Sequence, residues 1–183
     1  MMTKEHRPSS PQSGDLFDEL LVVMAQQGDK RALARLYERW NPRLVRAARR
    51  YTDASEPAQD LAQECWLAIC KRIGKLSDPA RFRSYAFAIL HRRGADHLKR
   101  VVQERERIDQ QSDAGSATDA RADEGLDLRQ AFSALPAEQR LAAHLHFVEG
   151  LTLSEIAAVL RIPQGTAKSR LFHARRKLKA ALQ

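Results

Sequence analysis

Several features are scarce or missing in this chain of 183 residues, and each excludes a class of protein. The only cysteines, Cys65 and Cys70, lie five positions apart in a helical pattern, which fits neither a disulfide framework nor a zinc-binding motif. No apolar run is long enough to cross a membrane, and the N-terminus lacks a signal-peptide pattern. We therefore expect a protein of the reducing cytoplasm, without membrane insertion.

Motifs of catalysis are also missing. The sequence has no glycine-rich phosphate loop, no nucleophile elbow and no HExxH zinc motif. His144 and His146 would lie on different sides of a helix, which makes them a poor metal-binding pair. We expect no enzymatic activity, no catalytic residue, no metal, no cofactor and no small-molecule substrate.

Basic residues, in contrast, are abundant. The chain has 31 Lys and Arg against 23 Asp and Glu, a formal net charge of +8. Such an excess favours a polyanionic partner, although an acidic protein surface would be attracted as well.

The apolar residues recur at helical spacing, and no segment alternates like a strand, so we predict an all-α protein. Residues 103–125 contain mostly polar and acidic residues, which cannot bury enough surface to offset the entropy of ordering. We expect a flexible acidic linker there, between two small helical domains at 15–102 and 126–183. Residues 1–14 are polar and are predicted to be a disordered tail.

Capping and helix-breaking residues predict four helices in the first domain. Asp29 is expected to cap the second helix, and Pro42 should kink or break it. Ser55 is the predicted cap of the third helix. The fourth helix should run from Ala80 to about Val102, and it is strongly basic: it carries six Lys or Arg between Arg81 and Arg100 and a single acid.

The second domain ends in two helices joined by a tight turn. Thr152 and Glu155 form a capping-box pattern at the start of the first, and Pro163 ends it. From Pro163 onward there are six Lys or Arg and no Asp or Glu. This layout is typical of a helix-turn-helix whose second helix enters the DNA major groove, while a plain helical hairpin with a solvated basic face is the alternative.

Three stretches together resemble the extracytoplasmic-function (ECF) sigma factors, promoter-recognition subunits of bacterial RNA polymerase. DLAQECWLAI (60–69) is similar to the family's polymerase-binding helix. FRSYAFAILHRRGADHLKR (82–100) is similar to its helix for the melted downstream promoter element. The stretch from LPAEQR to RRKL (135–178) resembles its C-terminal domain, which reads the upstream element. The resemblance covers nearly everything from Leu16 to Leu182.

The resemblance implies three sets of contact residues. Polymerase core would be bound by Asp60, Gln63, Glu64 and Trp66. Downstream promoter DNA would be bound by Arg83, Tyr85, His91, Arg92, Lys99 and Arg100. Upstream promoter DNA would be bound by Thr166, Lys168, Ser169, Arg170, Phe172, His173 and Arg175.

The resemblance also implies partners. These are promoter DNA, the polymerase core through the coiled coil of its largest subunit and the flap region of its second-largest subunit, and an anti-sigma factor. An inhibitory partner of this kind would hold the two domains together and cover both basic faces. The implied function is that of an alternative sigma factor that directs promoter recognition and transcription initiation.

Several alternatives stay open at this level. Trp66, Tyr85 and Phe172 could pack in the core instead of contacting partners. Family members usually have glycine at the position of Arg161, and residues other than Tyr85, Arg92 and His173 on the DNA-facing helices, which leaves the preferred promoter sequence open. A stand-alone helix-turn-helix regulator and an interaction protein that mimics a sigma factor are the alternative functions.

Overall fold

The computed structural model describes residues 13–52, 54–109 and 126–181, and these residues are all helical or in turns. The N-terminal domain contains α1 (Ser13–Gln26), α2 (Lys30–Ala48), α3 (Ser55–Arg72), the short 3-10 turns η1 (Ile73–Lys75) and η2 (Pro79–Arg81), and α4 (Phe82–Asp109). The C-terminal domain contains α5 (Leu126–Ser133), α6 (Ala137–Ala143), the π-helical turn η3 (His144–Val148), α7 (Leu153–Leu160) and α8 (Gln164–Ala181). The all-α prediction is confirmed for the described residues.

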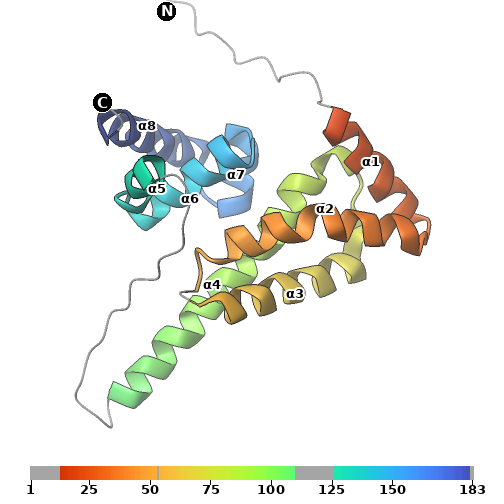
Figure 1. Ribbon diagram of the computed structural model, residues 1–183, viewed down its shortest axis with the longest axis horizontal. Helices are drawn as coiled ribbons and strands as arrows, with labels where there is room; N and C mark the ends of the chain where they lie inside the picture. Colours follow the sequence, from red (N-terminus) through yellow and green to blue (C-terminus); the bar gives the residue numbers. More distant parts are fainter. Residues whose placement is uncertain (1–12, 53, 110–125, 182–183) are drawn as a thin grey trace, which may run out of the picture.

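Helices α1 to α4 pack around an aromatic and aliphatic core. The Trp40 ring of α2 makes edge contacts with Phe82 and Phe87 of α4, at centroid distances of 5.2 and 6.3 Å. Asp29 caps α2 as predicted, because its carboxylate accepts hydrogen bonds from the backbone N–H groups of Arg31 and Ala32. The ring contacts of Trp40 hold α2 across α4 (Figure 1).

The predictions at Pro42 and Ser55 have different outcomes. Of the kink or break expected at Pro42, the break is absent, because α2 is continuous there and its flanking turns are anchored by the buried Leu36, Trp40 and Leu44. The cap predicted at Ser55 is wrong. Ser55 is the first helical residue of α3, and the cap position is occupied by Ala54, which provides no side-chain hydrogen bond.

Helix α4 is longer than predicted. It continues past Val102 to Asp109, so residues 103–109 are helical instead of belonging to a linker. The polar side chains there do not stop a helix that is already nucleated, since adding a residue to an existing helix is far easier than starting one. The remainder of the expected linker, 110–125, and residues 1–12 of the expected tail lie outside the described residues.

A close approach in the middle of α4 depends on Gly94. A Cβ atom at this position would lie 2.3 Å from the Tyr51 ring, so only glycine allows the turn after α2 to pack against α4. Tyr51 is buried, and its hydroxyl lies 2.9 Å from Nδ1 of His91.

In the C-terminal domain, α7 begins with the predicted capping box. The Thr152 hydroxyl accepts the Glu155 backbone N–H, and the Glu155 carboxylate accepts the Thr152 backbone N–H. Helix α7 ends at Arg161, which has left-handed backbone angles (φ 53°, ψ 47°). This conformation favours glycine, so an arginine at this position introduces backbone strain into the turn.

The two domains pack against each other. Helix α7 lies against α4, and the buried Leu151, Ile156 and Ala157 join the same apolar cluster as the core of the N-terminal domain. In Figure 1 the C-terminal domain lies beside the N-terminal end of α4, while the distal end of α4 projects beyond α2 and α3. No helix in the described part of the chain is long and apolar enough to cross a membrane.

Candidate nucleic-acid and polymerase interfaces

Helix α8 presents an exposed face with charged and aromatic side chains. Lys168 and Arg175 are exposed, and Phe172 is 63% exposed, so the alternative of a core position for Phe172 does not apply. The His173 ring lies edge-on against Phe172, with centroids 5.5 Å apart. An exposed aromatic ring between two cations suits contact with base edges and phosphates.

The opposite face of α8 consists of small side chains. Ala167 and Ala174 are fully buried, which lets α8 pack closely against α6 and α7. The capping box of α7 and the left-handed turn at Arg161 set the angle between α7 and α8. The local sequence thus aims the exposed face of α8 away from its own domain.

Three predicted upstream contacts of α8 have partners within the protein. The Ser169 hydroxyl donates to the carbonyl oxygen of Thr166 at 2.9 Å. Arg170 forms an ion pair with Glu138 of α6, with 2.5 Å between Nη2 and Oε2. Arg170 therefore braces α8 against α6 in this arrangement and is not turned outward like Lys168.

Helix α4 holds its predicted contact residues more tightly near its N-terminus. Arg92, Lys99 and Arg100, the three predicted contacts farthest from the N-terminus of α4, are exposed. Arg83 forms an ion pair with Asp15 of α1, and Tyr85 packs partly buried against Phe82. The six residues therefore divide into an exposed distal group and a proximal group engaged in packing.

His91 belongs to the engaged group. Burial lowers the pKa of His91 below its ordinary value of 6.5, and the nearby cations Arg161 and Arg170 act in the same direction. With its hydrogen bond to Tyr51, this histidine supports the junction between α4 and the turn after α2.

On α3, the predicted polymerase face is only partly as expected. Asp60 and Gln63 are exposed, and Glu64 lies 3.5 Å from Arg93 of α4 in an ion pair. Trp66 is only 4% exposed, so the interpretation as an exposed anchor is wrong. Its ring packs against Tyr37 of α2 with centroids 5.1 Å apart, because α2 covers the side of α3 from which Trp66 projects.

Two apolar residues near this face were missed from the sequence. Leu67 is 57% exposed on α3, and Tyr37 is exposed on α2. Both line a groove of ≈ 870 Å³ between the two helices, together with Gln63 and Cys70. Leu67 follows Trp66 directly, so its outward direction could have been inferred once Trp66 was placed inside.

The two cysteines differ in environment. Cys65 is buried, and burial raises the pKa of its thiol to about 12. Cys70 is exposed at the groove between α2 and α3. Among the described residues, no group of three or more His, Cys, Asp or Glu side chains is placed to hold a metal ion.

A larger cleft of ≈ 1740 Å³ separates α8 from the N-terminal domain. Its C-terminal wall includes Lys168, Leu171, Phe172 and Arg175 of α8. Its N-terminal wall includes the acidic side chains Asp15, Asp18 and Glu19 of α1, and residues of η2. The face of α8 predicted to read DNA is therefore opposite an acidic helix end of its own chain.

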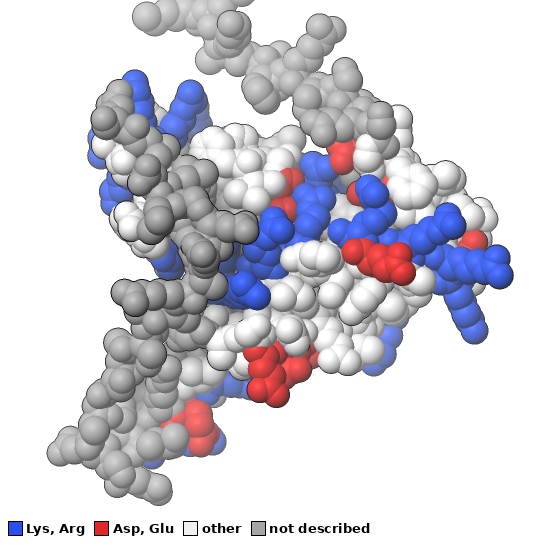
Figure 2. Space-filling model, in the orientation of Figure 1, with Lys and Arg blue, Asp and Glu red and all other residues white. Residues whose placement is uncertain are grey.

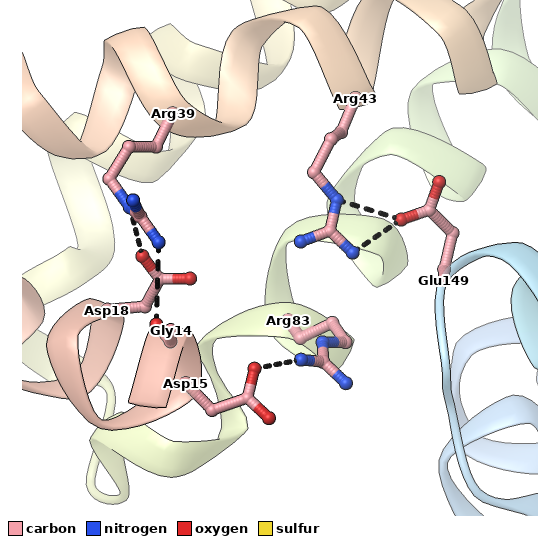
Figure 3. A network of polar contacts seen from close by, with 7 residues as sticks. All are labelled: Gly14, Asp15, Asp18, Arg39, Arg43, Arg83 and Glu149. Carbon is pink, nitrogen blue, oxygen red and sulfur yellow. Dashed lines mark hydrogen bonds and ion pairs between the residues drawn. The ribbon is translucent and has the colours of Figure 1, made fainter. Parts of the chain in front are cut away.

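Polar contacts join α2 and the turn after it to the C-terminal domain. The Arg43 guanidinium of α2 donates twice to Oε2 of Glu149, at 3.0 Å from Nε and 2.7 Å from Nη2 (Figure 3). Arg50 donates to Nδ1 of His144 at 2.7 Å, and His144 Nε2 lies 3.3 Å from Glu149 Oε1. Glu149 and His144 are almost completely buried.

The charge states at this interface follow from the contacts. Burial alone would raise the pKa of Glu149, but the His144 contact and the Arg43 guanidinium outweigh it and hold that pKa below its ordinary value. Burial lowers the pKa of His144 despite Glu149, and it lowers the pKa of Arg50 to about 10. The interface is therefore built from a carboxylate, a neutral imidazole and two arginines.

Comparisons with known families agree with these two domains. The family model for Sigma-70 region 2 matches residues 36–104, and that for Sigma-70 region 4 matches residues 125–178. Together they cover about two thirds of the chain.

Curated relatives match along almost their whole length. The RNA polymerase sigma-H factor of Pseudomonas aeruginosa is 28% identical, over 91% of this chain and 94% of its own. The ECF RNA polymerase sigma-E factor of Escherichia coli K12 is 27% identical, over 89% of this chain and 93% of its own.

Two solved structures share the fold. One is CnrH in complex with the cytosolic domain of CnrY, with a TM-score of 0.63, 24% identity and coverage of 91% of this chain and 97% of that one. The other is the sigma factor RpoE in complex with the anti-sigma factor NepR from Bartonella quintana, with a TM-score of 0.66, 23% identity and coverage of 81% and 95%. The matched regions, their order and the full-length relatives show that this chain belongs to the extracytoplasmic-function sigma factors of the sigma-70 family.

Proposed function

We propose that this alternative sigma factor joins the polymerase core through α3, reads the downstream promoter element with α4 and reads the upstream element with α8. The observation that carries the proposal is the placement of the exposed basic face of each domain within its matched sigma-70 region. The protein would act in the cytoplasm, where RNA polymerase transcribes the chromosome.

The polymerase contact would centre on the groove between α2 and α3. Asp60 and Gln63 provide an exposed polar rim, while Leu67 and Tyr37 offer apolar surface. This combination of an apolar centre and a polar rim is common in protein interfaces. The proposed partner is the coiled coil of the largest subunit, and the flap region of the second-largest subunit would engage the C-terminal domain.

DNA would be contacted by the two helices in different ways. The distal cations of α4, Arg92, Lys99 and Arg100, would follow the backbone of the opened strand. Lys168, Phe172 and Arg175 of α8 would enter the major groove of the upstream duplex.

The arrangement with both domains packed together would be inactive. Duplex DNA must reach α8, yet the reading face of α8 lines a cleft that α1 and η2 close from the other side. We therefore propose that the domains separate on polymerase. An anti-sigma factor would bind the closed arrangement and prevent this separation.

Transcription from a promoter library with purified polymerase core tests the proposal. Specific transcripts should appear only when the protein is added. Asp60→Lys combined with Gln63→Glu should weaken core binding without changing the promoters selected, while Lys168→Glu should abolish selection and leave core binding intact. Binding to palindromic duplexes as a dimer, without core-dependent transcripts, would instead identify a stand-alone regulator.

A further inference from the structure

Helix α2 carries an arginine-rich face that lies mostly outside the proposed contacts, and only its members Arg46 and Arg49 also line the groove between α2 and α3. Between Arg31 and Arg50 the chain has seven arginines and only one acid, Glu38. Those arginines are Arg31, Arg35, Arg39, Arg43, Arg46, Arg49 and Arg50. At 3.6 residues per turn, all seven fall within a sector of about 120° around the helix axis. Figure 2 shows Lys and Arg side chains gathered along α2 across the visible face.

The chemistry of arginine indicates which kind of partner this face would bind. Arginine offers a planar fork of donors that matches the oxygens of carboxylates and phosphates, and it loses its hydration more readily than lysine. Successive turns of the helix place such forks about 5.4 Å apart along one line. A row of this kind suits an extended chain of oxyanions better than a single charged group.

Carboxylates of the protein itself already occupy part of the row. Arg39 pairs with Asp18 of α1 at 2.6 Å, and Arg43 donates two hydrogen bonds to Glu149 (Figure 3). The Arg43 guanidinium also lies 4.2 Å from the centroid of the Trp40 ring. The remaining members differ: Arg31, Arg35, Arg46 and Arg49 are exposed, and none of them forms an ion pair within the described residues.

We propose that the arginine face of α2 binds the sugar-phosphate backbone of DNA, and that Glu149 competes with phosphate for Arg43. When the C-terminal domain moves away, Glu149 leaves with it and exposes Arg43 and Arg50 beside the four exposed arginines. The row then runs from Arg31 to Arg50, with Arg39 still paired to Asp18 of its own domain. DNA binding and domain closure would therefore exclude each other at a shared guanidinium.

DNA is the favoured polyanion because of the neighbouring surfaces. The face lies on the same domain as the distal cations of α4. Backbone contacts carry no sequence information but add affinity, which is what a surface of seven arginines with a single acid among them provides.

The test uses the complete protein without polymerase, so its result is independent of the transcription experiment. Arg43→Gln and Glu149→Gln each remove the same interdomain ion pair. If Arg43 binds phosphate, Glu149→Gln should bind DNA at least about fivefold more tightly than the unchanged protein, whereas Arg43→Gln should not gain this affinity. Equal affinities of the two variants would overturn the proposed competition, because a purely structural ion pair predicts the same effect for both.

A second variant tests the face outside both the interdomain contacts and the groove between α2 and α3. Replacing Arg31 and Arg35 by Gln changes only exposed side chains that line neither of them. Anisotropy with a mixed-sequence oligonucleotide of about 20 nucleotides, single-stranded or as a duplex, should be recorded between about 50 and 200 mM salt. Each lost contact should reduce the slope of log K against log salt by about 0.9 for duplex and about 0.7 for single-stranded DNA.

The matched control is Lys71→Gln with Lys75→Gln, which removes exposed cations at the end of α3 and in η1. It should leave the salt slope nearly unchanged. An unchanged slope in the variant that lacks Arg31 and Arg35 would overturn the proposal. If that variant instead lost polymerase binding with its DNA slope intact, the face would belong to an acidic protein surface.

Discussion

Helices α4 and α8 both carry cations proposed to contact promoter DNA, but they differ in how many of those side chains are already engaged. On α8, Lys168, Phe172 and Arg175 are exposed to solvent. On α4, Arg83 pairs with α1, Tyr85 packs in the bundle and His91 bonds to Tyr51. The upstream set thus keeps these three side chains exposed although Ser169 and Arg170 have partners inside the C-terminal domain, whereas half of the downstream set also holds the N-terminal domain together. Substitutions in the two helices should therefore fail in different ways.

The largest effect is expected from charge reversal on α8. Lys168→Glu with Arg175→Glu replaces two contacts, each worth about 1–3 kcal/mol, by repulsion, so promoter-specific transcription should fall at least about 100-fold. Run-off transcription with excess core measures this, and circular dichroism should be unchanged because both residues are exposed. Lys179→Glu, near the end of α8, is the control, and an equal loss there would contradict a localised reading face.

The comparison of α4 with α8 also predicts that replacing a helical glycine by alanine destabilises the protein on α4 and stabilises it on α8. Gly94→Ala places a methyl group 2.3 Å from the Tyr51 ring and should destabilise the protein by about 1–3 kcal/mol. Gly165→Ala on α8 meets nothing within 4 Å and should stabilise by about 0.5–1 kcal/mol, since alanine favours the helix. Urea unfolding compares the two, and similar unfolding midpoints would mean that α4 is not packed more tightly than α8.

Replacing Arg161 by glycine should relieve the backbone strain in the turn before α8. Arg161 has a φ of 53°, in the left-handed region that costs most residues about 1–2 kcal/mol. After allowance for the greater freedom of glycine in the unfolded chain, Arg161→Gly should raise stability by about 0.5 kcal/mol. Thermal unfolding should show a small upward shift. Arg161→Ala keeps the strain while removing the side chain, so a gain of the same size there would point to charge and not to backbone conformation.

The smallest effect concerns protonation on α4. His91 has a pKa below 6.5, so folding favours its neutral form. The corresponding stability is fully present above pH 6.5 and declines as pH falls below that value. An NMR titration of the imidazole proton should give a midpoint below 6.5, and Tyr51→Phe, which removes the hydrogen-bond partner, should shift it. A midpoint at or above 6.5 would contradict the prediction that burial lowers the pKa of His91.

The sequence predicted features that are encoded locally. Thr152 and Glu155 are three residues apart, so the capping box can be inferred from the chain alone, and Asp29 is a similar case. The start of α3 was missed by one residue, because Ala54 takes the cap position without a side-chain bond that a pattern could reveal.

Features that depend on contacts between residues far apart in the chain could not be predicted from local sequence patterns. Periodicity puts Trp66 on one side of α3 but does not reveal that Tyr37 of α2 covers it. Arg43 and Glu149 are separated by 106 positions, and nothing local to either predicts their pairing. The seven arginines around α2 are visible in the sequence, but the pairing of two of them with Asp18 and Glu149 depends on segments far along the chain.

The contrast between the two cysteines has a practical consequence for chemical labelling. Thiol reagents attack the thiolate, and a thiol with a pKa of about 12 forms almost none at neutral pH, so Cys65 should stay unmodified while the protein is folded. Cys70 is exposed at the edge of the groove between α2 and α3. The unaltered chain therefore has one addressable position for a fluorophore, and it lies where arrival of the polymerase would change the emission.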